Sequence, residues 1–219
     1  MSGPLDWISI EVGEVVLNRA RALRALRDER YGNIFGEAAS DMRWIGEVGE
    51  IIMAGWLAER HTAGAGWAYY WATSKVCGEP DFWIGTSSVD VKTVKRASAM
   101  KPEYTAQVTA RHTQEDVDYF FFTTYIVSER KLLLLGGIDR AQFLSSARYY
   151  GAGQWVHTYY QIRPGHEIYN IGVANLTPPL IWLGEIAARA SATQLPCSVV
   201  RIRKSSLPLI DRYTQRGTL

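Results

Sequence analysis

Residues 81–94 read DFWIGTSSVDVKTV, and this stretch decides the fold. Apolar and polar residues alternate on both sides of the turn-rich segment 85–88. Alternation of this kind, interrupted by Gly, Thr and Ser, is typical of two strands joined by a tight turn. The sequence therefore predicts a hairpin with strands at 81–84 and 89–94.

The charged residues of this hairpin fall on one face. If residues 85–88 form a four-residue turn, Asp81 lies opposite Lys92 and diagonal to Asp90. The other face is apolar and suited to a core; it carries Phe82, Ile84, Val89 and Val91. The same register puts Trp83 on the charged face, so either this tryptophan borders the charged group or a bulge shifts the register.

Two carboxylates on one face have a chemical consequence. Asp81 and Asp90 would repel each other unless a divalent cation lay between them, and oxygen ligands of this kind suit magnesium, with manganese as a substitute. Lys92 beside them would hold a water molecule or stabilise charge that develops on a phosphate. The pattern therefore indicates metal-assisted phosphodiester hydrolysis.

The composition sets limits on this interpretation. The chain has 219 residues, 47% of them hydrophobic, which is enough to bury the core of a single domain. A formal net charge of +2 is too small for the whole surface to attract a polyanion, so nucleic-acid affinity must come from local patches. Cys77 and Cys197 lack the spacing of a zinc site or a disulfide framework. Because neither a leader pattern nor a membrane span is evident, we expect a soluble cytoplasmic protein.

Two helices are expected before the hairpin. Apolar residues recur at helical intervals in 11–30, with five arginines between them. Such a charge run is usually a solvated face, and direct phosphate contact is the alternative. The second helix, 41–60, is apolar or small between Trp44 and Ala58 at every position except Glu47 and Glu50. Since a buried unpaired carboxylate is costly, we expect at least one of these glutamates to meet a metal or a cation.

The rest of the chain supplies strands and helices in turn. Further strands are predicted at 105–110, 119–127, 131–135 and 168–173, and helices at 139–149 and 180–190. The aromatic stretch 67–71 is interpreted as a buried strand, with stacking on an unpaired base as the alternative. This order indicates an α/β or α+β fold with a mixed sheet.

At this point the chain resembles the PD-(D/E)xK nuclease superfamily, which includes many restriction endonucleases and Holliday-junction resolvases. The matching residues are Gly46-Glu47-Val48-Gly49-Glu50 on the helix, Pro80-Asp81 at the first strand and Asp90-Val91-Lys92 on the second. The resemblance covers roughly residues 44–96 by motif and extends more loosely to about 150. Because the motif is short, it identifies chemistry better than substrate.

The resemblance implies an α/β restriction-endonuclease-like core, a mixed β-sheet flanked by helices. It implies that Asp81 and Asp90 bind magnesium, that Lys92 positions the attacking water, and that a helix glutamate supports the metal, Glu50 being favoured over Glu47. It also implies a symmetric homodimer. We expect one nuclease domain over 1–219, with a helical N-terminal segment 1–40, a core at about 41–175, and a C-terminal helix and tail 176–219.

The function expected from these features is a magnesium-dependent endonuclease that hydrolyses phosphodiester bonds in double-stranded DNA. The alternatives are a catalytically inactive nuclease-fold module for DNA binding or assembly, and a nuclease specific for branched DNA or RNA. The predicted backbone contacts are Lys95, Arg96 and Lys101, together with Arg201, Arg203 and Lys204. The histidines lack metal-ligand spacing and are interpreted as structural or surface residues; they are His61, His112, His157 and His166.

Overall fold

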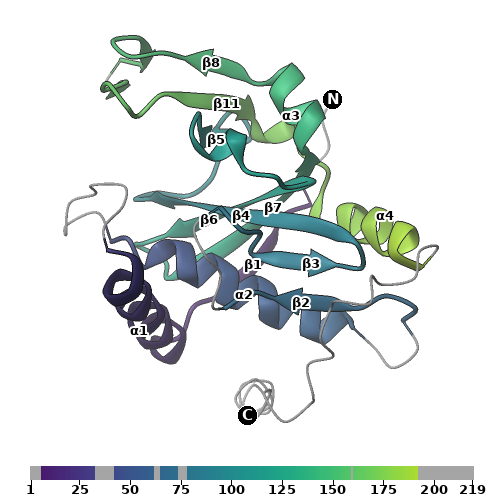
Figure 1. Ribbon diagram of the computed structural model, residues 1–219. Helices are drawn as coiled ribbons and strands as arrows, with labels where there is room; N and C mark the ends of the chain where they lie inside the picture. The colour runs from purple at the N-terminus through teal and green to yellow at the C-terminus, as the bar shows by residue number, and fades with distance from the viewer. Residues whose placement is uncertain (1–5, 33–41, 62–64, 74–77, 159, 192–219) are drawn as a thin grey trace.

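The computed structural model describes residues 6–32, 42–61, 65–73, 78–158 and 160–191. Within these residues, six strands form one mixed sheet (Figure 1). Their order is β1 (Ile8–Glu11), β7 (Lys131–Asp139), β6 (Tyr119–Ile126), β4 (Ser87–Arg96), β3 (Phe82–Ile84) and β2 (Tyr69–Trp71). Strands β4 and β6 run parallel and the other neighbours run antiparallel.

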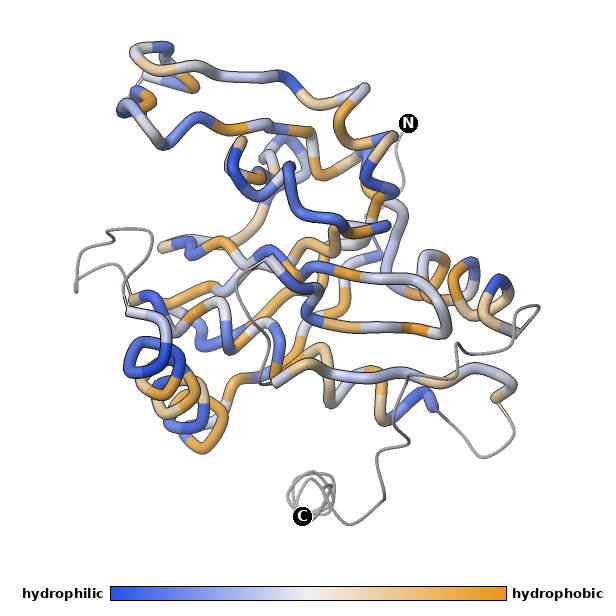
Figure 2. Tube along the Cα trace, in the orientation of Figure 1, coloured by the Kyte–Doolittle hydropathy of each residue, from blue (hydrophilic) through white to orange (hydrophobic). Residues whose placement is uncertain are grey.

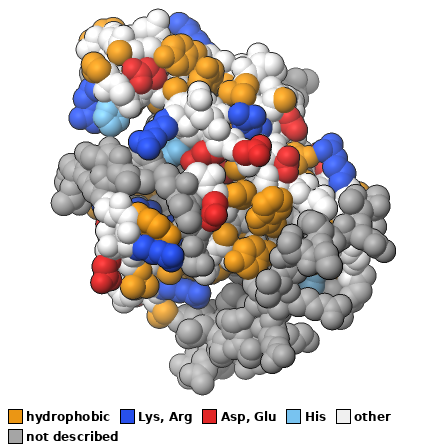
Figure 3. Space-filling model, viewed as in Figure 1, with side chains coloured by type: hydrophobic (Ala, Val, Ile, Leu, Met, Phe, Trp, Pro, Cys, Tyr) orange, Lys and Arg blue, Asp and Glu red, His pale blue; other side chains and the backbone are white. Residues whose placement is uncertain are grey.

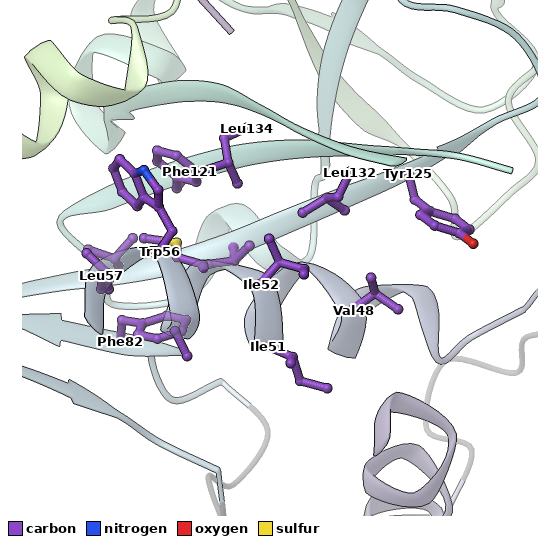
Figure 4. Close-up of a cluster of buried hydrophobic side chains, with 14 of the residues drawn as sticks. Val48, Ile51, Ile52, Trp56, Leu57, Phe82, Phe121, Tyr125, Leu132 and Leu134 are labelled. Carbon is purple, nitrogen blue, oxygen red and sulfur yellow. The ribbon is translucent and has the colours of Figure 1, made fainter. Parts of the chain in front are cut away.

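One face of this sheet is covered by helix α2 (Ile45–Arg60), and helix α1 (Glu14–Tyr31) packs against α2 (Figure 1). Because α2 is apolar around most of its circumference, it can be buried on several sides. Figure 4 shows its side chains meeting those of the sheet; the labelled residues are Val48, Ile51, Ile52, Trp56 and Leu57 of α2 and Phe82, Phe121, Tyr125, Leu132 and Leu134 of the strands. This layer is the first hydrophobic core.

The other face carries a smaller layer. It consists of helix α3 (Arg140–Ser146) and a three-stranded sheet in the order β5 (Thr105–Thr109), β11 (Ile168–Gly172) and β8 (Arg148–Tyr150). Phe121 of β6 belongs to the first core, whereas its neighbours Phe120 and Phe122 belong to a second core with Phe143 of α3. Strand β6 is therefore buried on both faces, as a central strand between two layers must be.

Helix α4 (Pro179–Ser191) packs against β7 and β3 at the end of the sheet. Hydrophobic and hydrophilic residues alternate along it in Figure 2, as expected for a helix with one buried face. Its Trp182 lies against Gly137 of β7, where an added Cβ would overlap the indole ring. The glycine thus permits the close contact between helix and sheet.

Most elements predicted from the sequence are present, and several differ in extent, among them the strand predicted at 131–135, which runs to Asp139. The fold is α/β with a mixed sheet flanked by helices, as expected. The helix predicted at 139–149 ends at Ser146, because the following residues form β8 and pair with β11. The N-terminal segment, expected to be helical, also contains strand β1, which pairs with β7. The third predicted segment of the chain, 176–219, is described only as far as residue 191.

The predicted register of the hairpin is wrong, because each residue of the first strand pairs two residues earlier in the second strand than predicted. Strands β3 and β4 are joined by the two-residue turn Gly85-Thr86, and Ile84 faces Ser87. Gly85 has a φ of +59°, and a positive φ at the first central residue alone is characteristic of a type II′ turn. Because the pairing shifts by an even number of residues, each side chain keeps the face that was predicted for it.

Candidate active site

The two hairpin aspartates lie side by side. Phe82 pairs with Val89, so Asp81, one residue before Phe82, is level with Asp90. Both carboxylates are almost fully buried, with exposed fractions of 1% for Asp81 and 3% for Asp90. Asp81 Oδ2 accepts a hydrogen bond of 2.7 Å from the backbone N–H of Val91. The same end of the hairpin therefore buries two acidic residues, Asp81 just before β3 and Asp90 in β4.

The apolar face of the hairpin explains this placement. Its side chains pack into the first core, and they are Phe82, Ile84, Val89 and Val91. Asp90 and Lys92 must then point to the opposite side of β4, because successive side chains alternate along a strand. The predicted apolar face of the hairpin is confirmed, and β4 carries Asp90 and Lys92 on its other face.

Lys92 carries the positive charge of this group. Its Nζ forms an ion pair with Asp90 Oδ2 and lies 3.6 Å from Glu115 Oε2. Burial acts to lower the pKa of Lys92, but the negative charges of Asp90, Glu115 and Asp81 outweigh burial and raise it above its ordinary value. Lys92 is therefore a cation at neutral pH and cannot act there as a base.

Glu115 is a site residue that the sequence did not indicate. It directly follows the short helix η2 (His112–Gln114), and its Oε1 lies 3.9 Å from His112 Nε2. His112 Nδ1 in turn makes a 2.9 Å hydrogen bond with the hydroxyl of Thr109. The parallel pairing of β4 with β6 brings the segment before β6 beside the start of β4. Since that pairing is non-local, no local pattern marks Glu115.

The helix glutamates have arginine partners. Glu50 accepts hydrogen bonds of 2.7 and 2.8 Å from Arg27 in a bidentate pair, and a third of 3.2 Å from Trp71 Nε1. Glu47 Oε1 contacts Arg24 and accepts a 2.8 Å hydrogen bond from Arg27. The expected cation partner is thus a guanidinium group, which neutralises these buried carboxylates.

Arg27 links the glutamates to the hairpin. Burial acts to lower the pKa of Arg27, but its hydrogen bond to Glu50 and the charges of Glu50, Glu47 and Asp81 more than offset burial and raise it. Because Asp81 is among these charges, Arg27 lies within electrostatic range of Asp81. Arg27 therefore stays charged at the border between α1 and the site.

The arginines of α1 mostly hold the helix in place. In addition to Arg24 and Arg27, the guanidinium of Arg19 lies 5.4 Å from the centre of the Trp71 ring, and that of Arg21 lies 4.9 Å from the centre of the Trp44 ring. These cation–π contacts join α1 to neighbouring elements. The interpretation of this run as a solvated face is therefore wrong for Arg24 and Arg27, whereas Arg21 is exposed as that interpretation predicts.

The aspartate pair fits a magnesium ion by its donor chemistry. Among the described residues, no three His, Cys, Asp or Glu side chains gather as a ready-made metal site. Magnesium, however, is commonly held by one or two carboxylates and completes its shell with water and substrate phosphate. Asp90 Oδ2 is buried and has the ammonium of Lys92 as its partner. Both oxygens of Glu50 already have donors.

The predicted DNA-contacting residues divide into two kinds. Lys95 and Lys101 are exposed. Arg96 is half-buried, donates a 2.8 Å hydrogen bond to the carbonyl of Thr105 and lies 4.6 Å from the centre of the Tyr104 ring. Burial lowers its pKa, while the charge of Tyr104 acts in the opposite direction. Arg201, Arg203 and Lys204 lie outside the described residues.

The aromatic stretch and the remaining histidines lie elsewhere. Tyr69–Trp71 form β2, and the Trp71 ring stacks on Phe82 at 6.1 Å, so a half-buried strand replaces the expected fully buried one. His61 Nε2 makes a 2.9 Å hydrogen bond with the carbonyl of Trp67, which agrees with a structural role. His157 and His166 are exposed.

The chain was compared with family models, curated proteins and solved structures, and none of the three comparisons gave a match. Among the described helices, none is both long enough and apolar enough to cross a bilayer.

Proposed function

We propose that the chain is a magnesium-dependent endonuclease that hydrolyses phosphodiester bonds in DNA, built on a restriction-endonuclease-like core. The observation that carries this proposal is the buried pair Asp81 and Asp90, level across the hairpin, with the ammonium of Lys92 in contact with Asp90. Two adjacent buried carboxylates are expensive to keep ionised without cations. A metal ion bound by both carboxylates would offset this cost.

Asp81 and Asp90 would hold the magnesium ion, which would polarise the scissile phosphate and lower the pKa of a bound water. Manganese, with similar ligand preferences, would substitute for it. The geometry of Asp81 supports this role, because its Oδ2 is oriented by the N–H of Val91. A ligand with a fixed orientation loses little entropy when it binds a metal.

Lys92 would supply positive charge to the reacting phosphate. Its raised pKa keeps it protonated, so it can donate hydrogen bonds to a water molecule or a phosphate oxygen but cannot take up a proton. Glu115, 3.6 Å from its Nζ, holds the ammonium from the other side and is a candidate to accept a proton from the attacking water. The proposed roles of Lys92 and Glu115 require no side chain beyond those already in contact with Lys92.

Glu50 and Glu47 receive supporting roles in this proposal. Glu50 orients Arg27, and Arg27 lies within electrostatic range of Asp81. An arginine at the edge of a carboxylate site is suited to bind a phosphate of the DNA backbone. Lys95 and Lys101, both exposed, are the proposed outer backbone contacts.

The alternative is an inactive nuclease-fold module that binds DNA or assembles with other proteins. The observation that favours it is the ion pair of Lys92 with Asp90, which gives this carboxylate a partner without a metal. Under this alternative the charged cluster is structural. Magnesium would then neither bind at the hairpin nor support cleavage.

Incubation of the protein with circular and linear duplex DNA in magnesium tests the proposal. We expect nicked or linear products from the wild-type protein and a loss of at least about 100-fold with Asp90→Asn, because removing a metal ligand removes most of the catalysis. Asp116→Asn, at an exposed carboxylate near the site, is the matched control and should cleave normally. Absence of cleavage with every DNA form, or full activity of Asp90→Asn, would contradict the proposal.

A further inference from the structure

A two-stranded ribbon projects from the three-stranded sheet, toward the upper left of Figure 1. It consists of β9 (Trp155–His157) and β10 (Tyr160–Gln161) and lies in the chain between β8 and β11. We call residues 148–158 and 160–167 the arm. A two-stranded ribbon has little opportunity to bury its side chains, so their character reflects their surroundings in solution.

The arm exposes large aromatic side chains. The exposed fractions are 58% for Trp155, 49% for Tyr149 and 36% for Tyr160. The ring of Tyr160 lies 5.9 Å from that of His157, which is also exposed. Aromatic residues are common in β-strands, but there their rings normally pack against a neighbouring sheet or helix. Exposed rings of this size are instead suited to contact a partner.

The charge of the arm is mainly basic, and its one carboxylate, Glu167, is its last residue. From Arg140 to His166 the sequence contains no Asp or Glu, although the whole chain has 22 of them. The arm carries Arg148, Arg163 and His157, all exposed, and the guanidinium of Arg148 lies 4.8 Å from the centre of the Tyr150 ring. Figure 3 shows hydrophobic, basic and histidine side chains, with an acidic one among them, at the upper left of this face. A phosphate backbone can approach such a surface with little repulsion.

A series of contacts connects the base of the arm to the candidate site. Tyr150 and Thr109 both pair with Ile168 of β11. The Thr109 hydroxyl hydrogen-bonds His112, His112 lies 3.9 Å from Glu115, and Glu115 lies 3.6 Å from Lys92. A strand bound along the arm would therefore approach the site through its Glu115 side.

We infer that the arm binds single-stranded DNA, with unpaired bases stacked on Trp155 and Tyr160 and phosphates near Arg148 and Arg163. Duplex bases are stacked on one another and offer no free ring face to these side chains, whereas every unpaired base does. The binding of a single strand stands on the arm alone. Its consequence for cleavage, that the preferred substrate contains an unpaired segment such as a flap or a branch, rests on the proposed function.

Fluorescence anisotropy of a labelled oligothymidylate, titrated with the full chain in EDTA, tests the binding. We expect Trp155→Leu with Tyr160→Leu to weaken binding by roughly 25-fold to 10,000-fold, because each of the two lost stacking contacts is worth roughly 5-fold to 100-fold. Trp155→Phe, which keeps an aromatic face, should bind nearly as wild type. Arg148→Gln should reduce the slope of log affinity against log salt by about 0.7. The matched control is Leu180→Ala with Ile181→Ala, an equally exposed apolar pair on α4.

Two results would overturn the inference. One is unchanged oligothymidylate binding by the double leucine variant, which would leave the aromatic surface for a protein partner. The other is duplex binding as tight as single-strand binding and equally sensitive to the leucine substitutions. Because the titration contains no magnesium, a protein that binds oligothymidylate through the arm but cleaves no DNA would refute the proposed function alone. A protein that cleaves DNA but binds oligothymidylate equally well with and without the two leucine substitutions would refute this inference alone.

Discussion

Asp81 lies level with Asp90 across the β3–β4 hairpin, since the adjacent pair is Phe82 with Val89. A four-residue turn would have put Lys92 in the position that Asp90 occupies. The observed register therefore brings the two carboxylates together and leaves Lys92 one step further along the same face of β4. This difference decides whether the site has a pair of adjacent acidic ligands.

The aspartate pair predicts that magnesium stabilises the folded protein. A ligand at about 100 times its Kd adds roughly 2.7 kcal/mol to the free energy of unfolding, which for a chain of this size raises Tm by about 5–10 °C. Asp90→Asn and Asp81→Asn should each abolish this shift, while Asp116→Asn should keep it. Thermal scans with magnesium and with EDTA measure the effect. An unchanged shift in both hairpin variants would place the ion elsewhere.

Lys92 predicts a stability contribution that extends into alkaline pH. The pKa of Lys92 is raised in the folded state above its ordinary value of 10.5. A group of this kind contributes fully below its unfolded pKa, and the contribution is lost as pH rises through the folded pKa. In EDTA at neutral pH, we expect Lys92→Met to lower the free energy of unfolding by about 3–5 kcal/mol, because Asp90 and Glu115 lose their cation.

Denaturant titrations at several pH values check this prediction. They give the difference in free energy of unfolding between Lys92→Met and wild type. The difference should stay constant from roughly pH 7 to 9 and shrink only at higher pH. Tyr69 and Tyr119, whose pKa values are raised by burial, also titrate in alkali, but they do so in both proteins and cancel in the difference. A difference that disappears below about pH 9 would contradict a raised Lys92 pKa.

Glu115 is predicted to matter for cleavage and not for metal binding. Its Oε2 lies 3.6 Å from Lys92 Nζ, so Glu115→Gln should lower the cleavage rate by roughly 10-fold to 1,000-fold, the usual contribution of a proton-transfer or positioning group. The magnesium-dependent rise in Tm should remain. Asp116→Asn, next in the chain and exposed, should cleave like wild type. Loss of the magnesium shift in Glu115→Gln would instead make Glu115 a metal ligand.

The hairpin shows why the sequence predicted side-chain faces better than pairing. The alternation of apolar and polar residues depends only on the strand, so it survives any even change of register. The turn was assigned too long because Ser87 and Ser88 resemble turn residues. Ser88 instead lies in β4, where its N–H and hydroxyl both donate to Asp118 Oδ2 at 2.8 and 2.9 Å. That long-range partner is not visible in the local pattern.

The partners of the glutamates were beyond local inference for the same reason. A buried carboxylate on an apolar helix implies a cation, and the sequence indicated that much for Glu47 and Glu50. Whether that cation is a metal ion or a basic side chain depends on which element of the fold packs against the two glutamates. The packing of α1 on α2 brings Arg24 and Arg27 to them, and this contact joins residues 23 positions apart.

The Arg27–Glu50 pair is predicted to couple strongly. Both side chains are largely buried, so Arg27→Met alone should cost about 3–5 kcal/mol by leaving an unpaired carboxylate. Arg27→Met with Glu50→Met should cost less than the sum of the single changes, since the double variant buries no unpaired charge at this position. A double-mutant cycle measured by denaturant unfolding gives the coupling energy, expected above about 1 kcal/mol.

The exposed pair Arg21–Glu14 on the same helix is the matched control for this cycle. Its contact is a single one of 3.3 Å, and its side-chain exposures are 46% and 52%. Water and salt screen such a pair, and its coupling should lie between about 0 and 1 kcal/mol. Equal coupling in the two cycles would mean that burial does not strengthen the Arg27 network.

The two glycines of the helix motif are predicted to respond in opposite directions to alanine. A Cβ on Gly49 would lie inside van der Waals contact with Thr93 Oγ1 and 3.0 Å from Thr123 Oγ1, whereas a Cβ on Gly46 would meet nothing within 4 Å. Thr93 and Thr123 belong to the paired strands β4 and β6 and are joined by a 2.9 Å hydrogen bond, so they cannot easily retreat. Gly49→Ala should cost about 1–3 kcal/mol by overpacking. Gly46→Ala should add about 0.5–1 kcal/mol through helix propensity, and denaturant unfolding of the two variants measures both changes. Loss of stability in both would mean that helix α2 approaches the sheet differently at its first turn.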